Sequence, residues 1–162
     1  MSSEAFTLVR PVKQSGPVLF SSPHSGRDYP AAFRSRSRLA MLALRSSEDA
    51  FVDRLFAAAP GYGAPLLSAQ APRAYLDLNR SSEELDPAVV EGAPKIAQNP
   101  RISSGLGVIP RVVANGRAIY EGRISLAEAE ARLQRLWHPY HNALRALMEE
   151  THQQFGRAVL ID

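Results

Sequence analysis

The chain has 162 residues, of which 45% are hydrophobic and 22% charged, a composition typical of one globular domain. Cysteine is absent, which excludes disulfide frameworks, thiolate nucleophiles and cysteine-ligated zinc, so His, Asp and Glu remain as metal ligands. The formal net charge is +3 and the sequence pI is about 9.6. The basic residues form no stripe interleaved with aromatic residues, and the sequence carries no nucleic-acid-binding motif. We therefore expect no nucleic-acid partner.

The apolar runs are all far shorter than the roughly 20 residues that span a bilayer. Residues 1–10 lack the apolar segment of a secretory signal. We therefore expect a cytoplasmic protein that does not enter membranes. Nearly all its basic residues are arginines, whose planar guanidinium binds carboxylate or phosphate in a bidentate manner, although coding bias would produce the same surplus.

The first predicted strand covers residues 17–21, an apolar run closed by Pro23 and Gly26. It places His24 in the loop just beyond the strand. Residues 65–69 form another short apolar run, which predicts a second strand.

A helix is predicted between these two strands, with Ser46 or Ser47 as its N-cap. Its apolar face would contain Phe51, Val52, Leu55 and Phe56. Residues 73–78 alternate enough to predict a third strand. Strands that alternate with helices in this way indicate an α/β fold.

Residues 81–104 are rich in Ser, Glu, Pro and Gly and show no period, so we predict a long loop. The Asn115-Gly116 pair lies between two apolar runs. This arrangement predicts a β-hairpin, because its turn needs positive φ at both positions.

A long helix is predicted after Ser125, which with Glu128 forms a capping box. Pro139 should kink this helix, because proline removes one backbone donor and clashes with the preceding turn. Gly156 is predicted to end it, and residues 159–162 begin another buried strand. The apolar stripe of the helix contains Leu126, Ala129, Leu133, Leu136, Tyr140, Leu144 and Leu147.

These elements predict a single α/β domain over residues 1–162, with a mixed sheet flanked by helices. A strand that ends on the last residue is unusual, since strands of α/β folds are followed by a turn and usually by a helix. We therefore expect a domain that is incomplete at its C-terminus.

The candidate site residues lie at the ends of predicted elements, and no metalloprotease, serine-hydrolase or P-loop motif accompanies them. His24, Asn79 and Arg80 would face one crevice at the carboxyl ends of the strands. The alternative for His24 is a structural or solvent-exposed histidine, and for Arg80 it is a surface ion pair, which contributes little. For Glu48 the alternative is a favourable position in the first turn of a helix.

His138 and His141 are three residues apart on the long helix, within reach of one shared ion. A partly buried, hydrogen-bonded pair is the better explanation of this spacing. His152, near the end of the same helix, suits the helix dipole.

Several motifs in a fixed order resemble the N-formylglutamate amidohydrolase family, whose zinc-hydrolase fold is similar to that of zinc carboxypeptidases and aspartoacylase. The resemblance extends over nearly the whole chain from Val18 onward. The motifs are Pro23-His24-Ser25-Gly26 with Tyr29-Pro30, Ser47-Glu48-Asp49 with Val52-Asp53, Pro72-Arg73-Ala74-Tyr75-Leu76-Asp77-Leu78-Asn79-Arg80 with Glu84-Leu85-Asp86-Pro87, Ile119-Tyr120-Glu121-Gly122-Arg123, and Pro139-Tyr140-His141 before Leu144.

The resemblance implies one Zn²⁺ per chain, with His24 and Glu48 as two of its ligands. In the family, the strand matching residues 159–162 is followed by a Cys-His-Ser-Met or similar segment, whose histidine would be the third ligand. The resemblance also implies a carboxylate general base, which these motifs do not identify.

The implied reaction is zinc-dependent hydrolysis of N-formyl-L-glutamate to glutamate and formate, a step of histidine degradation. Arg80, positioned by Asp77 and Asn79, would bind one carboxylate of this dicarboxylate substrate, and Arg73 the other. The alternative is a catalytically incomplete fragment or pseudoenzyme that binds carboxylate ligands or a partner subunit. Another N-acyl acidic amino acid would suit the same residues.

Overall fold

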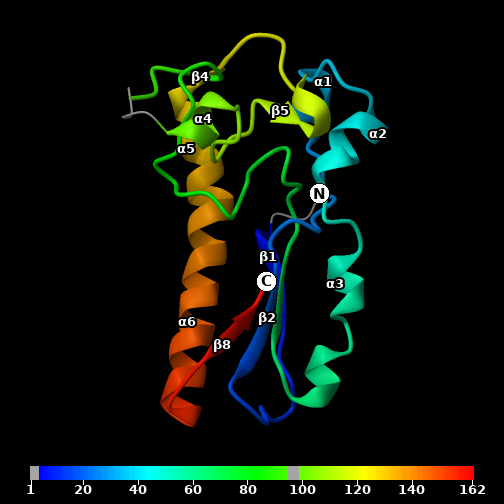
Figure 1. Cartoon of the computed structure of the whole chain (residues 1–162), viewed down its shortest axis with the longest axis vertical. Helices are drawn as coiled ribbons and strands as arrows, with labels where there is room; N and C mark the ends of the chain where they lie inside the picture. Colours follow the sequence, from blue (N-terminus) through cyan, green and yellow to red (C-terminus); the bar gives the residue numbers. More distant parts are fainter. Residues whose placement is uncertain (1–3, 95–98) are drawn as a thin grey trace.

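The computed structural model describes residues 4–94 and 99–162, and its centre is a mixed four-stranded sheet with the order β1-β3-β2-β8. β1 pairs with β3 in antiparallel fashion, whereas β2 pairs in parallel with both β3 and β8. Figure 1 shows the sheet between the long helix α6 on one side and α3 on the other. The strands are β1 (Phe6–Val9), β2 (Val18–Ser22), β3 (Leu66–Ala69) and β8 (Val159–Ile161).

The two inner strands confirm the predictions for residues 17–21 and 65–69. Every residue of β3 is buried, and Leu19 of β2 is fully buried, because these strands lie between neighbours and helices. The predicted strand at residues 159–162 is present as β8, but the prediction that it is buried is wrong. β8 forms an edge of the sheet, and all three of its residues are exposed.

The predicted helix cap at Ser46 or Ser47 is wrong. Both serines lie in the 3-10 turn η1, and α3 begins only after Phe51, which adopts a left-handed conformation with φ 68°. The Ser46 hydroxyl instead donates a hydrogen bond to the Ala43 carbonyl. The short helices of this half are α1 (Ala31–Ser35), α2 (Met41–Leu44), η1 (Arg45–Ser47), α3 (Val52–Leu55) and η2 (Ala59–Tyr62).

Residues 73–78 do not form the predicted strand. Their backbone turns instead, because the Pro72 carbonyl accepts hydrogen bonds from the N–H groups of both Tyr75 and Leu76. Their apolar side chains are nevertheless buried in the core, which is why the segment resembles a strand in sequence. The turn leaves Asp77, Asn79 and Arg80 in a loop beyond the sheet, where their polar side chains can form a site, while Leu78 between them is buried in the core.

The segment 81–104 is mostly loop, as predicted, and residues 95–98 lie outside the described part. The hairpin at Asn115-Gly116 is confirmed, with φ of 61° and 68° at these two residues and antiparallel pairing of β5 with β6. The remaining small elements are β4 (Val90–Glu91), α4 (Pro100–Ser103), β5 (Val112–Val113), η3 (Ala114–Gly116), β6 (Arg117–Ala118) and β7 (Ile124–Ser125).

The long helix is built from α5 (Leu126–Arg132), the π-helical turn η4 (Leu133–Trp137) and α6 (His138–Phe155). Ser125 caps it by accepting a hydrogen bond from the Glu128 N–H, and Gly156 ends it with φ 70°, both as predicted. The irregularity expected from Pro139 takes the form of the π turn just before it.

Arg132 joins this helix to the core of the upper part of the molecule. Its buried guanidinium lies 4.0 Å from the Tyr75 ring centroid and donates to the Tyr120 hydroxyl and to the carboxylate of Glu128. These partners offset the cost of burying a charge. They also fix the α5 end of the helix against the segment that leads into residues 77–80.

Within residues 4–94 and 99–162, no helix has both the length and the apolar character that crossing a membrane requires.

Candidate active site

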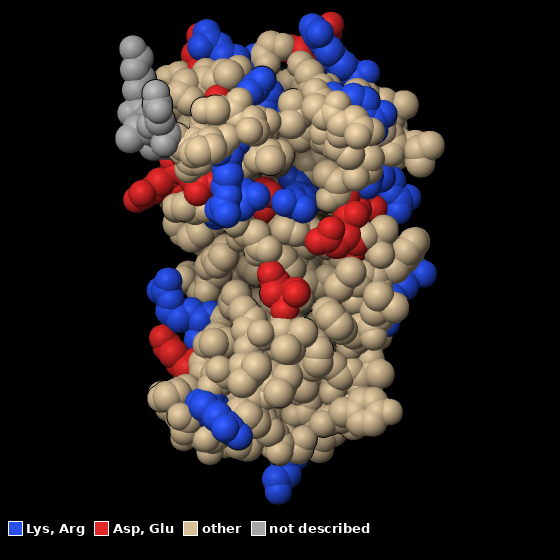
Figure 2. Space-filling model, in the orientation of Figure 1, with Lys and Arg blue, Asp and Glu red and all other residues tan. Residues whose placement is uncertain are grey.

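Charged side chains gather in a band across the middle of the face shown in Figure 2, whereas the surface below it is largely uncharged. The loop after β2 brings His24 to this level. Its Gly26 lies so close to the chain beyond β3 that a Cβ atom there would be 2.1 Å from the Ala71 carbonyl oxygen. A backbone hydrogen bond of 3.1 Å from the Asp49 N–H to the His24 carbonyl attaches the next loop. Close backbone packing therefore defines the position of His24.

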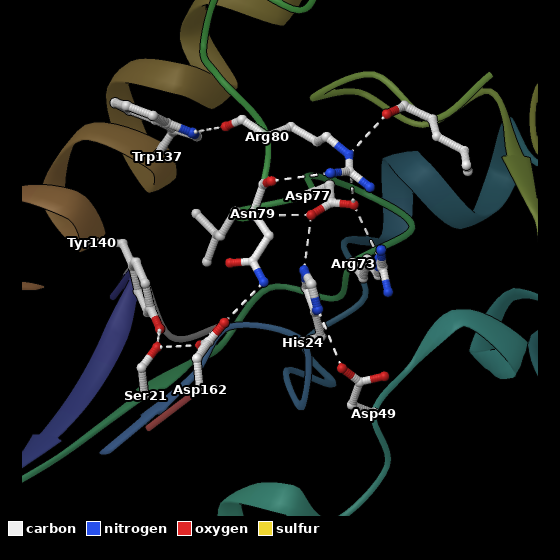
Figure 3. Close-up of polar contacts among 12 residues, drawn as sticks. Ser21, His24, Asp49, Arg73, Asp77, Asn79, Arg80, Trp137, Tyr140 and Asp162 are labelled. Carbon is white, nitrogen blue, oxygen red and sulfur yellow. Dashed lines mark hydrogen bonds and ion pairs between the residues drawn. The ribbon is translucent and has the colours of Figure 1, made fainter. Parts of the chain in front are cut away.

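The His24 ring lies between two carboxylates (Figure 3). Its Nε2 is 2.8 Å from Asp77 Oδ1, and its Nδ1 is 3.2 Å from Asp49 Oδ2. The side chains of His24 and Asp77 are 5% and 1% exposed, whereas that of Asp49 is 55% exposed. The Nδ1 edge of the ring thus faces the accessible side of the site.

The carboxylate of Asp77 is the common partner of the predicted site residues. Oδ1 accepts hydrogen bonds from His24 and from the Asn79 N–H, and Oδ2 accepts one of 3.0 Å from Arg73 Nε. The Nε of Arg80 lies 3.9 Å from the same Oδ2. Burial alone would raise the pKa of Asp77, but His24, Arg73 and the Asn79 N–H together lower it below its ordinary value.

Arg73 and Arg80 both use Nε to contact the protein. Arg80 Nε donates to the Leu106 carbonyl, and Arg80 Nη1 lies 3.3 Å from the Asn79 carbonyl. The terminal nitrogens of Arg73, and Nη2 of Arg80, make no hydrogen bond to the described residues. Both guanidinium groups therefore keep terminal donors for a ligand beside one buried carboxylate.

Glu48, predicted beside His24, is held elsewhere by other partners. Its carboxylate accepts a hydrogen bond of 2.6 Å from the Tyr29 hydroxyl and one of 3.1 Å from Arg45 Nε. Burial, together with the bond to Glu48, raises the pKa of Tyr29. The carboxylate in contact with His24 is that of the neighbouring residue, Asp49.

Two acidic residues were missed as site candidates from the sequence. Asp49 follows Glu48 directly, so sequence position could not tell which carboxylate turns toward His24. Asp162, at the end of β8, accepts hydrogen bonds from the Ser21 hydroxyl and from the Asn79 side-chain amide. Its position after a strand parallel to β2 was the one available signal.

His138 and His141 do not form the pair that their spacing indicated. His141 Nε2 instead donates a hydrogen bond of 2.9 Å to the Leu78 carbonyl, and its ring stacks on Trp137 with 4.0 Å between centroids. His138 contacts the edge of the same indole.

A mixed α/β fold with a polar site at the carboxyl ends of parallel strands is typical of enzymes that bind small polar ligands. The sequence profile of N-formylglutamate amidohydrolase matches residues 16–162. The chain therefore belongs to the N-formylglutamate amidohydrolase family.

Three relatives illustrate this similarity. N-formylglutamate deformylases of Pseudomonas putida and Pseudomonas aeruginosa are 29% and 30% identical to the chain, over 90% of its length and 50% of theirs. The crystal structure of N-formylglutamate amidohydrolase from Ralstonia eutropha is similar to this one, with a TM-score of 0.86 over 96% of this chain and 55% of that one. The two sequences are 38% identical. The chain thus spans about half the length of the relatives it matches.

The contact between Trp137 and His141 makes the titration of His141 measurable. Burial lowers the pKa of His141 below its ordinary value of 6.5, the charges of Arg145 and His138 add to this effect, and the bond to Leu78 opposes it. Because a protonated imidazole quenches a neighbouring indole, the fluorescence of the single tryptophan should fall as the pH decreases, with a midpoint below 6.5.

The matched variants are His141→Gln, which should remove the component with a midpoint below 6.5, and His138→Gln, which should keep that component. A transition that persists unchanged in His141→Gln would contradict the assignment.

Proposed function

We propose that this chain carries the substrate-binding and part of the zinc-binding machinery for hydrolysis of N-formyl-L-glutamate to glutamate and formate. The observation that carries the proposal is the arrangement around Asp77, with His24 on one carboxylate oxygen and two arginines at the other. The relatives named as N-formylglutamate deformylases support the substrate. A zinc-carboxypeptidase-like architecture and a place in histidine degradation belong to the same proposal.

The donor groups around His24 suit a zinc ion. A neutral imidazole carries one N–H and cannot donate to both Asp77 and Asp49. With Zn²⁺ at Nδ1, the Nε2–H would remain for Asp77, the arrangement in which a carboxylate orients a metal-binding histidine. Neighbouring ligands of tetrahedral zinc are about 3.3 Å apart, and His24 Nδ1 is 3.2 Å from Asp49 Oδ2.

His24 and Asp49 are therefore the two proposed ligands, with Asp49 in place of Glu48. Among residues 4–94 and 99–162, no group of three or more His, Asp or Glu side chains is arranged to hold a metal. The described residues supply two ligands of the proposed site.

The two arginines are suited to the two carboxylates of N-formylglutamate. Their Nε atoms are fixed on protein acceptors, so each guanidinium would bind a carboxylate through its terminal nitrogens. Because both approach the same oxygen of Asp77, the two bound carboxylates would lie close to the His24 ring. The formyl group of the substrate would then be presented on the exposed Nδ1 side.

Bound zinc would lower the pKa of a coordinated water to about 7 and polarise the formyl carbonyl. Hydrolysis adds water across the formyl C–N bond, giving formate and the free amine of glutamate. Asp77 contributes by holding the His24 ring and both arginines in one geometry, so that substrate binding needs little reorganisation.

Zinc titration by calorimetry tests the ligand assignment. We expect His24→Ala and Asp49→Ala to lose measurable zinc binding, and Asp77→Asn to weaken it about 10- to 100-fold, because Asp77 orients His24. Glu48→Gln is the matched control and should bind like the wild type. Loss of binding in Glu48→Gln with retention in Asp49→Ala would contradict the assignment.

L-glutamate binding tests the arginine pair. Arg80→Lys should weaken binding about tenfold, because an ammonium is a point charge that cannot reproduce the two-donor geometry of guanidinium. Arg101→Lys is the control, since the Arg101 side chain makes no hydrogen bond within the described part of the chain. Equal affinities of wild type and Arg80→Lys would remove Arg80 from the binding site.

The second candidate function is carboxylate binding without catalysis, which is favoured because no group of three metal-ligating side chains occurs among the residues that the structure describes. Glutamate binding without formate release from N-formyl-L-glutamate, at saturating zinc, would support this function instead.

A further inference from the structure

The loop 77–80 is held from the side of the long helix at two backbone carbonyls. His141 Nε2 donates to the Leu78 carbonyl, and Trp137 Nε1 donates to the Arg80 carbonyl, each over 2.9 Å. Figure 3 shows the Trp137 indole directed at Arg80 from the helix. The two bonds flank Asn79, whose N–H is already held by Asp77 Oδ1.

The spacing of Trp137 and His141 along the helix explains how both donors reach the loop. Trp137 is the last residue of the π turn, and His141 follows four positions later on α6, so the two side chains share one face of the helix. Their rings stack with an interplanar angle of 34°. Pro139 lies between them and donates no backbone hydrogen bond, which makes the irregular turn tolerable at this point.

The side chain of Arg80 depends on the backbone that these bonds hold. This side chain is 14% exposed, and its contacts to Leu106 and Asn79 involve backbone carbonyls rather than a carboxylate at close range. Because the Asn79 carbonyl that holds Nη1 belongs to the same loop, a shift of this backbone would move both the Arg80 Cα and one of its guanidinium contacts relative to Arg73.

We propose that Trp137 and His141 are positioning residues that clamp the carbonyls of Leu78 and Arg80 and so set the Arg80 guanidinium for a substrate carboxylate. This inference rests on the proposed function, in which Arg80 binds a carboxylate. Neither residue needs to touch the substrate.

The test compares three aromatic replacements. Trp137→Phe and His141→Phe each keep a ring in the stack and remove one donor, so packing changes little while a carbonyl loses its partner. The control is His138→Phe, because His138 contacts the same indole but makes no hydrogen bond to the described residues.

Two measurements are made on each variant: the amide hydrogen exchange rate, residue by residue, and the affinity for L-glutamate. We expect exchange at the Asn79 and Arg80 amides to accelerate about tenfold in the two donor variants, while Leu67 in β3 exchanges as in the wild type. We expect affinity for L-glutamate to fall about tenfold in the same variants. His138→Phe should change neither quantity.

Two results would overturn the clamp. One is exchange at Asn79 and Arg80 that is unchanged, or that rises together with exchange at Leu67, because that indicates a general structural role. The other is faster exchange at Asn79 and Arg80 with unchanged glutamate affinity. If the wild type itself binds no glutamate, the proposed function fails. Amide exchange that accelerates at Asn79 and Arg80 but not at Leu67 then decides whether the clamp exists.

Discussion

The buried carboxylate of Asp77 is the interaction on which the rest of the site depends. A charge that is 1% exposed is costly unless it is fully partnered. Here His24 and the Asn79 N–H contact one oxygen, and Arg73 and Arg80 approach the other. To supply these partners, the loop beyond β2 and the loop at residues 77–80 must meet at one point above the sheet.

The sheet makes this meeting possible. β2 and β3 run parallel, so their carboxyl ends lie at the same edge, and Gly26 allows the backbones beyond them to touch. On the other side, β8 runs parallel to β2 and brings Asp162 to Asn79. The core fixes the strands, the strands fix the loops, and the loops fix the polar groups. The proposed function depends on polar side chains that are held in place in this way.

The inner strands, the hairpin and the long helix could be predicted because each has a strong local signal: an apolar run, an Asn-Gly pair, or a repeated apolar stripe with a cap. The strand predicted at residues 73–78 failed because burial by tertiary packing produces the same alternation as a sheet. β1 was missed because its edge position leaves it short and partly exposed. Phe51 could not be predicted to adopt positive φ, which moved the start of α3 and left both serines outside a cap.

The motifs pointed to His24, Arg73, Asp77, Asn79 and Arg80, and the structure brings these five residues together around the Asp77 carboxylate. The proposal of Asp49 rather than Glu48 as a ligand rests on the structure, since adjacent residues point in different directions and the contact with His24 distinguishes them. The contacts of Trp137 and His141 could not be predicted for a related reason: helical spacing predicts which residues share a face, but not which backbone carbonyls of a distant loop lie against that face.

The most direct test of this account is the tautomeric state of His24, measured from the ¹⁵N resonances of its ring in the zinc-loaded protein. With only four histidines, the chain is suited to such an assignment. The account predicts a proton on Nε2, hydrogen-bonded to Asp77, and a metal-bound Nδ1. A proton on Nδ1, or no effect of zinc on the nitrogens of His24, would contradict it.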